Sequence, residues 1–159
     1  HRRHAGVVPG MTTTEGNAPS KIVYTATATA SGGGRREGRS VTSDGQLDVV
    51  LQAPAELGGP GGGTNPEQLF AVGYGACFTG ALHAVAKKEG EDVTGATVDV
   101  AIGFGPEGDS FGITADLTVK VPGKDVATVQ RLADLTHDFC PYSKAIKGNV
   151  PTTVTAVEA

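Results

Sequence analysis

Hydrophobic and polar positions alternate along several stretches of the chain, as is typical of β-strands with one buried face. The clearest stretches are 98–104 and 111–119, and the intervening Gly105-Pro-Glu-Gly-Asp109 predicts that they form an antiparallel hairpin. A further strand is expected over 22–30 and another over 150–157. The segment 41–52 contains Asp44-Gly45, which predicts a tight turn between two short strands.

Two segments show helical patterns instead. The stretch 69–86 contains no formally charged residue, so a helix there is expected to be buried nearly all round. Asn65 is a suitable N-cap for this helix, and Pro66 suits its first position. A second helix is expected after Asp125, because its apolar residues recur at helical spacing until Pro141 interrupts the pattern.

The predicted order of elements, β-β-β-α-β-β-α-β, indicates an α+β fold with an antiparallel sheet and two main helices. At 159 residues the chain is expected to form one domain, over 21–159. Residues 1–20 are expected to be a disordered leader or an expression remnant, since ten residues precede the only methionine and a polar stretch follows.

Composition narrows the possible partners. The net charge of −4 argues against a nucleic-acid partner and against an anionic membrane surface. No apolar run is expected to reach the length of a membrane span, so a soluble cytoplasmic protein is predicted. Thiols are kept reduced in that compartment, where paired cysteines are more often catalytic or metal-binding than structural.

The chain contains two cysteines, and their local settings differ. Cys77 lies within the apolar helical segment, where a free cysteine is commonly a small packing residue. Cys140 directly precedes Pro141 and a short segment whose N-terminal dipole would lower a thiol pKa. On local grounds Cys140 is therefore the more acidic thiol. Packing residues, a structural bridge and a redox couple all remain possible.

Charged residues near the expected helix start could act on a thiol. Arg35, Arg36 and Arg39 crowd one Gly-rich turn, and a guanidinium can hold a cysteine as its thiolate, although a solvated turn is commoner. Glu67 could pair with an arginine or simply favour the helix N-terminus. His137 and Cys140 could form half of a zinc site, but the only other cysteine would have to complete it, so no metal is predicted.

Several motifs together resemble the organic hydroperoxide resistance (Ohr) branch of the OsmC/Ohr family. The segments that carry the resemblance are Tyr24-Thr-Ala-Thr-Ala, Arg36-Glu-Gly-Arg39, Asn65-Pro-Glu-Gln-Leu-Phe, Ala76-Cys77-Phe78 and Cys140-Pro-Tyr-Ser-Lys-Ala. The resemblance implies an OsmC-like fold, an intertwined homodimer and a cysteine-based peroxidase. It implies that Cys77 is the peroxidatic cysteine and Cys140 the resolving one. It also implies that Arg36, favoured over Arg35 by register, stabilises the thiolate and pairs with Glu67.

The implied activity is reduction of organic (alkyl or lipid) hydroperoxides to alcohols. Cys77 would become a sulfenic acid and then form a disulfide with Cys140, which a lipoylated protein or another dithiol would reduce; no cofactor is needed. We expect Phe70, Phe78 and Tyr142 to line the substrate site. The alternatives are an OsmC-type peroxidase without organic preference and a non-catalytic dimer that binds an apolar ligand.

The spacing of Glu67 and Cys77 constrains the prediction that an arginine paired with Glu67 stabilises the Cys77 thiolate. Ten residues of straight helix span about 15 Å, which one arginine does not bridge. Either the helix is not continuous between these two residues, or the arginine and Glu67 reach Cys77 across a dimer interface.

Overall fold

Two three-stranded sheets and three α-helices form residues 10–159, the part of the chain that the computed structural model describes. The first sheet consists of β1 (Ala28–Gly32), β2 (Glu37–Thr42) and β3 (Asp48–Gln52), all antiparallel. The second consists of β4 (Thr97–Glu107), β5 (Ser110–Lys120) and β6 (Thr152–Ala156). The helices are α1 (Pro66–Glu89), α2 (Val126–Phe139) and α3 (Pro141–Ile146), and a 3₁₀ turn, η1, covers Ala55–Leu57.

The predicted α+β class, the order of strands and the two main helices are confirmed. Two details differ from the prediction. The strands form two sheets rather than one, and β6 pairs with β5 in parallel, because the chain crosses over through α2 and α3 before it returns. β1 begins at Ala28, so the alternating residues 22–27 lie outside any strand and are exposed to solvent. Residues 1–9 of the expected leader lie outside the described part.

α1 has the ends that its sequence predicted. The side chain of Asn65 accepts a hydrogen bond of 2.9 Å from the backbone N–H of Gln68, and Pro66 follows at the first helical position. Gly90 ends the helix in the left-handed region, with φ of 70°, where a residue without Cβ is favoured. The cap at Asn65 and the glycine at Gly90 therefore define where α1 begins and ends.

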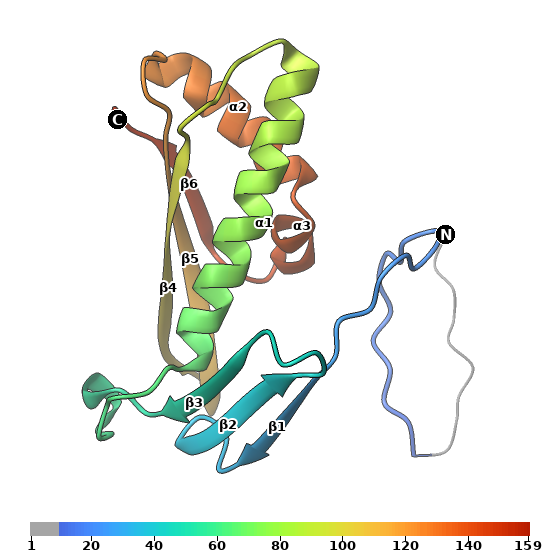
Figure 1. Cartoon of the computed structure of the whole chain (residues 1–159), viewed down its shortest axis with the longest axis vertical. Helices are drawn as coiled ribbons and strands as arrows, with labels where there is room; N and C mark the ends of the chain where they lie inside the picture. Colours follow the sequence, from blue (N-terminus) through green and yellow to red (C-terminus); the bar gives the residue numbers. More distant parts are fainter. Residues whose placement is uncertain (1–9) are drawn as a thin grey trace.

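The main core lies between α1, α2 and the β4–β6 sheet. The helices cover one face of this sheet, while the β1–β3 sheet lies beyond the N-terminal end of α1 (Figure 1). The large core side chains come from α1, β5 and α2: Tyr74, Phe78, Leu82, Leu117, Val119, Val129 and Leu132. Each Å² of apolar surface buried in this cluster contributes about 25 cal/mol of stabilisation, and this burial holds the helices against the sheet.

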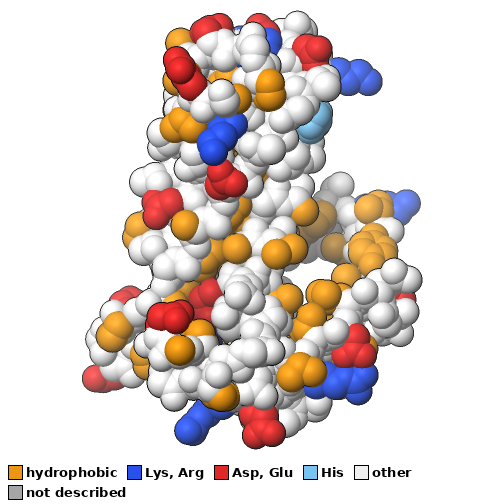
Figure 2. Space-filling view, turned by 60° about the vertical axis from the view of Figure 1, so that its left-hand side comes forward, with side chains coloured by type: hydrophobic (Ala, Val, Ile, Leu, Met, Phe, Trp, Pro, Cys, Tyr) orange, Lys and Arg blue, Asp and Glu red, His pale blue; other side chains and the backbone are white. Residues whose placement is uncertain are grey.

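The face of α1 opposite the core is open in the single chain. Val72 is 73% exposed, and Ala76 and Gly80 lie on the same exposed stripe at i+4 spacing. The prediction of a helix buried nearly all round is therefore wrong for the isolated chain. Figure 2 shows apolar side chains exposed over the middle of the molecule, with most Lys and Arg side chains in view toward its two ends.

α1 is also long and apolar enough to span a membrane by length and composition, so the expectation that no run reaches this length was wrong. A core helix passes the same test. The buried face of α1 packs on β4 and α2, as a core helix does.

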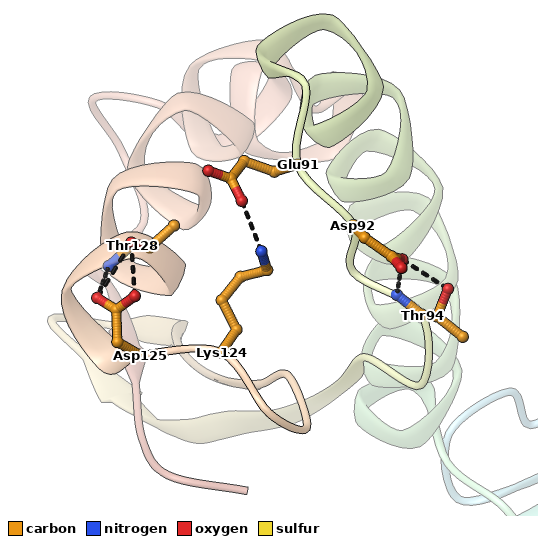
Figure 3. A network of polar contacts seen from close by, with 6 residues as sticks. All are labelled: Glu91, Asp92, Thr94, Lys124, Asp125 and Thr128. Atoms are coloured by element: carbon orange, nitrogen blue, oxygen red, sulfur yellow. Dashed lines mark hydrogen bonds and ion pairs between the residues drawn. The ribbon is translucent and has the colours of Figure 1, made fainter.

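Polar contacts at the far end of α1 fix the connections to the second sheet and to α2 (Figure 3). Lys124 donates to Glu91 across the two connections, and the Asp92 side chain accepts from the backbone N–H of Thr94. Asp125 caps α2 by accepting from the backbone N–H of Thr128 at 3.0 Å, as the sequence predicted. These contacts set the direction in which α2 runs toward Cys140.

Candidate active site

The two cysteines lie side by side. The Sγ atoms of Cys77 and Cys140 are 3.7 Å apart, with the Cys140 thiol donating to the Cys77 sulfur, and both are free thiols. Cys140 is fully buried, whereas Cys77 is partly exposed. Cys77 is therefore the more accessible of the two cysteines.

The break between α2 and α3 creates this contact. The backbone N–H of Cys140 closes α2 by donating to Thr136 at 2.8 Å, and Pro141 then prevents α2 from continuing. Cys140 adopts an extended conformation and precedes the first turn of α3. The next free amide, that of Tyr142, donates a hydrogen bond to the Cys77 sulfur. The helix start that the sequence assigned to Cys140 thus acts on the other cysteine.

The pKa of Cys77 is raised above that of an ordinary thiol, chiefly because burial disfavours the thiolate. The Tyr142 amide lowers the pKa, and the neighbouring Cys140 raises it. Within residues 10–159, no arginine is among the causes of this shift. The raised pKa favours the thiol form of Cys77, and a positive charge beside its sulfur would favour the reactive thiolate.

The structure pairs Glu67 with Arg35 and not with Arg36, so the predicted Arg36–Glu67 pair is wrong. Arg35 donates a hydrogen bond of 2.8 Å to Oε2 of the carboxylate and forms an ion-pair contact of 2.7 Å with Oε1, and its guanidinium lies 4.5 Å from the centre of the Phe104 ring. Arg35 and Arg36 lie in the turn between β1 and β2, where the backbone conformation of the turn sets the direction of each side chain. Register within the motif therefore did not decide between two adjacent arginines.

In the Arg35–Glu67 ion pair, each partner favours the charged form of the other. The hydrogen bond from Arg35 holds the pKa of Glu67 below its ordinary value, and the same bond raises the pKa of Arg35. Arg35 and Arg36 line a cavity of about 1020 Å³ together with Glu67, Phe104 and Phe111. The cavity therefore combines cationic heads with apolar walls.

α1 runs without interruption from Pro66 to Glu89, which removes one of the two explanations for the Glu67–Cys77 spacing. Glu67 and Cys77 are separated by ten residues of continuous helix, about 15 Å along its axis. The Arg35–Glu67 pair therefore lies far from Cys77 of the same chain.

The three expected substrate-lining residues occupy different environments. Phe70 lines a cavity of about 850 Å³ with Phe104, Phe111, Ile146 and other apolar groups. Tyr142 is 41% exposed and packs edge-on against Phe70, with ring centres 6.3 Å apart. Phe78 is fully buried in the core and has no surface open to a substrate here.

Two features of the site were not predicted from the sequence. Phe104 supports the Arg35 guanidinium, although alternation alone marked it as an ordinary strand residue. The hydroxyl groups of Tyr74 and Ser143 form a buried hydrogen bond beside the cysteines. No local pattern identifies either contact, because each joins residues more than 60 positions apart.

Comparison with known proteins places this arrangement in a family. The model of the family described as OsmC-like protein matches residues 59–155, more than half of the chain. The chain belongs to the OsmC/Ohr family. A curated relative, the organic hydroperoxide resistance protein of Xanthomonas axonopodis pv. citri (strain 306), is 51% identical over 140 residues, which cover 87% of this chain and 97% of the relative.

Solved structures agree with this family assignment. The organic hydroperoxide resistance protein of Elizabethkingia anophelis, with bound thiocyanate, has a TM-score of 0.81 and 37% identity, covering 87% of this chain and 99% of that one. The protein OhrB of Bacillus subtilis has a TM-score of 0.77 and 38% identity, covering 86% of this chain and all of that one. Both neighbours are from the Ohr branch, so the predicted branch and OsmC-like fold are confirmed.

Proposed function

We propose that this protein is a thiol-dependent peroxidase that reduces organic hydroperoxides to alcohols. The observation that carries the proposal is the 3.7 Å contact between the sulfurs of Cys77, a partly exposed residue, and Cys140, a fully buried one. A nucleophile must be accessible to its substrate, whereas a resolving thiol needs only to reach the nucleophile. Exposure thus supports the order Cys77 first and Cys140 second.

In the first step the Cys77 thiolate attacks the terminal oxygen of the hydroperoxide. The O–O bond breaks, the alkoxide leaves and takes a proton to become the alcohol, and the sulfur is oxidised to a sulfenic acid. The backbone amide of Tyr142 stabilises negative charge on the sulfur before attack.

In the second step the Cys140 thiol attacks the sulfenic sulfur. The S–O bond breaks, a disulfide forms, and the hydroxyl group leaves as water with the thiol proton. The two sulfurs must approach from 3.7 Å to about 2.05 Å, which needs only a small movement of α3. An external dithiol, such as a lipoylated protein, then restores both thiols by exchange and becomes a disulfide itself.

The charge that ionises Cys77 is proposed to come from a partner subunit in a homodimer. Burial is the main cause that raises the pKa of Cys77, and the Arg35–Glu67 pair lies about 15 Å along α1 from the same chain's sulfur. The exposed stripe of α1, which includes Val72, offers an apolar surface for a second copy. A dimer built on this stripe would bring Arg35 of one subunit to Cys77 of the other.

Substrate preference follows from the walls around this site. The backbone amide of Tyr142 donates to the Cys77 sulfur, and the Tyr142 ring packs on Phe70, which lines a cavity with mainly apolar walls. Such walls favour an alkyl or lipid chain over the small, strongly hydrated hydrogen peroxide. The names of the relatives, organic hydroperoxide resistance proteins, support the same preference. We place this activity in the cytoplasm, where dithiol reductants are maintained.

Stopped-flow turnover of an alkyl hydroperoxide by the wild type, Cys77→Ser and Cys140→Ser tests the proposal. Cys77→Ser is expected to lose the reaction, and Cys140→Ser is expected to keep a single oxidation without turnover. Hydrogen peroxide, assayed in parallel, is expected to react more slowly than the alkyl hydroperoxide. Full activity in Cys77→Ser would overturn the assignment.

A further inference from the structure

A buried hydrogen bond links α1 to α3 next to the two cysteines. The hydroxyl oxygens of Tyr74 and Ser143 are 2.6 Å apart, and both side chains are almost completely buried. Tyr74 lies three residues before Cys77 on α1, and Ser143 lies three residues after Cys140 on α3. The hydroxyl contact and the sulfur contact therefore join the same two segments about one turn apart.

The Tyr74 hydroxyl is close enough to the sulfurs to be affected by them. Its pKa is raised, mainly by burial, and charge on Cys140 or Cys77 raises it further, whereas the hydrogen bond with Ser143 lowers it. The hydroxyl is thus a neutral, buried group beside both thiols. It has the right location to hold the segment that carries Cys140.

α3 needs such a tether because it is short. Six residues form a helix that is unstable by itself in water, so its position depends on contacts with neighbouring elements. Tyr142 supplies a second contact by packing on Tyr74, with ring centres 5.9 Å apart. Gly73 makes room for that ring, since a Cβ there would lie 3.0 Å from the Tyr142 hydroxyl oxygen.

We propose that Tyr74 and Ser143 form a positioning pair that holds α3 against α1 and so keeps Cys140 within bonding reach of Cys77. The pair acts on the second step of the reaction, in which the sulfenic acid becomes a disulfide. It has no part in the attack on the peroxide. This inference rests on the proposed peroxidase function for its biological role, but the positioning itself is a separate physical claim.

Variants that remove single hydroxyl groups test the pair. Tyr74→Phe keeps the ring that packs on Phe78 and Tyr142, and Ser143→Ala keeps a small side chain in the same space. Each is expected to slow disulfide formation on the order of tenfold more than it slows sulfenic acid formation. The double variant is expected to be no slower than either single one, because both remove the same bond.

The measurement is rapid quenching after one equivalent of cumene hydroperoxide, followed by mass spectrometry of the Cys77 products. Dimedone traps the sulfenic acid, and the disulfide is counted directly. Excess peroxide is expected to leave more sulfinic acid in the variants, because a sulfenic acid that waits longer is oxidised further.

Thr136→Val is the matched control. Its hydroxyl is also fully buried and donates at 2.7 Å to Leu132, but that bond lies within α2 and links no second element. A general loss of stability would slow disulfide formation in this control as well. Disulfide formation at the wild-type rate in both Tyr74→Phe and Ser143→Ala would overturn the proposal, as would an equal slowing in Thr136→Val.

The thiol oxidant diamide separates this proposal from the proposed function. Diamide couples two thiols to a disulfide, and is itself reduced to the hydrazine, without a sulfenic acid. Slower coupling in Tyr74→Phe than in wild type would support the positioning pair even if wild type consumed no hydroperoxide. Equal coupling rates would count against the pair even if the peroxidase activity were established.

Discussion

At the scale of the residue, accessibility reverses the order of the cysteines that local sequence favours. Cys140 precedes a helix start, but its sulfur is fully buried and the first free amide of that helix points at Cys77. The sequence motifs identified both cysteines, and Glu67 as the carboxylate that pairs with an arginine. They did not identify which adjacent arginine pairs, because side-chain direction in a turn depends on the backbone that tertiary contacts impose.

The two adjacent arginines provide a direct comparison. Arg35→Ala is expected to lower the rate of Cys77 oxidation at pH 7 by about tenfold or more, because less of the sulfur is thiolate. Arg36→Ala, its matched control, is expected to remain close to wild type. Stopped-flow rates over a pH series measure both, and the Arg35 deficit should shrink as alkaline pH ionises the thiol. A larger loss in Arg36→Ala would reverse the assignment made from the geometry.

The Arg35–Glu67 pair also predicts a pH dependence of stability. The folded-state pKa of Glu67 is depressed, so its contribution is present above the unfolded value of about 4.3 and is lost as pH falls through the folded value. Because Arg35 is 36% exposed, the contribution is only about 1 kcal/mol. Urea unfolding should show Glu67→Gln less stable than wild type at neutral pH, with a difference that shrinks as the pH falls below about 4.3. A difference that grows in acid would contradict the sign.

At the scale of the element, the chain's own signals predicted most of the structure. Caps at Asn65 and Asp125, and the break before Pro141, gave both main helices close to their observed ends. The hairpin of β4 and β5 followed from alternation. The parallel pairing of β6 and the division into two sheets did not follow, because pairing between distant strands leaves no periodic trace in the sequence.

The N-cap of α1 should be measurable in isolation. Asn65→Ala removes the acceptor for the Gln68 amide and is expected to destabilise the fold by about 1 kcal/mol. Asn17→Ala, at an exposed position outside any element, is the control and is expected to have no measurable effect. Thermal unfolding of both proteins gives the comparison. Equal stability of the two variants would show that the cap does not stabilise α1.

At the scale of the whole molecule, the proposed dimer accounts for both the open stripe of α1 and the raised pKa of Cys77 in the single chain. A second copy would cover Val72 and its neighbours and would supply Arg35 to the sulfur. Val72→Glu is expected to weaken the dimer and to lower peroxidase activity together, since the charge would be buried without a partner. Ala127→Glu, exposed on α2, is the control. Sedimentation velocity measures the association.

If Val72→Glu became monomeric with full activity, Arg35 would have to reach Cys77 within one chain. The continuous helix between Glu67 and Cys77 makes that outcome incompatible with the contacts described.

The most direct test of the two-cysteine account is intact mass and peptide mass spectrometry after one equivalent of alkyl hydroperoxide. We predict a single Cys77–Cys140 disulfide that a dithiol returns to two thiols, and a Cys77 sulfenic acid in Cys140→Ser. A reduced Cys77 in wild type, with Cys140 oxidised first or with both thiols unchanged, would contradict the account.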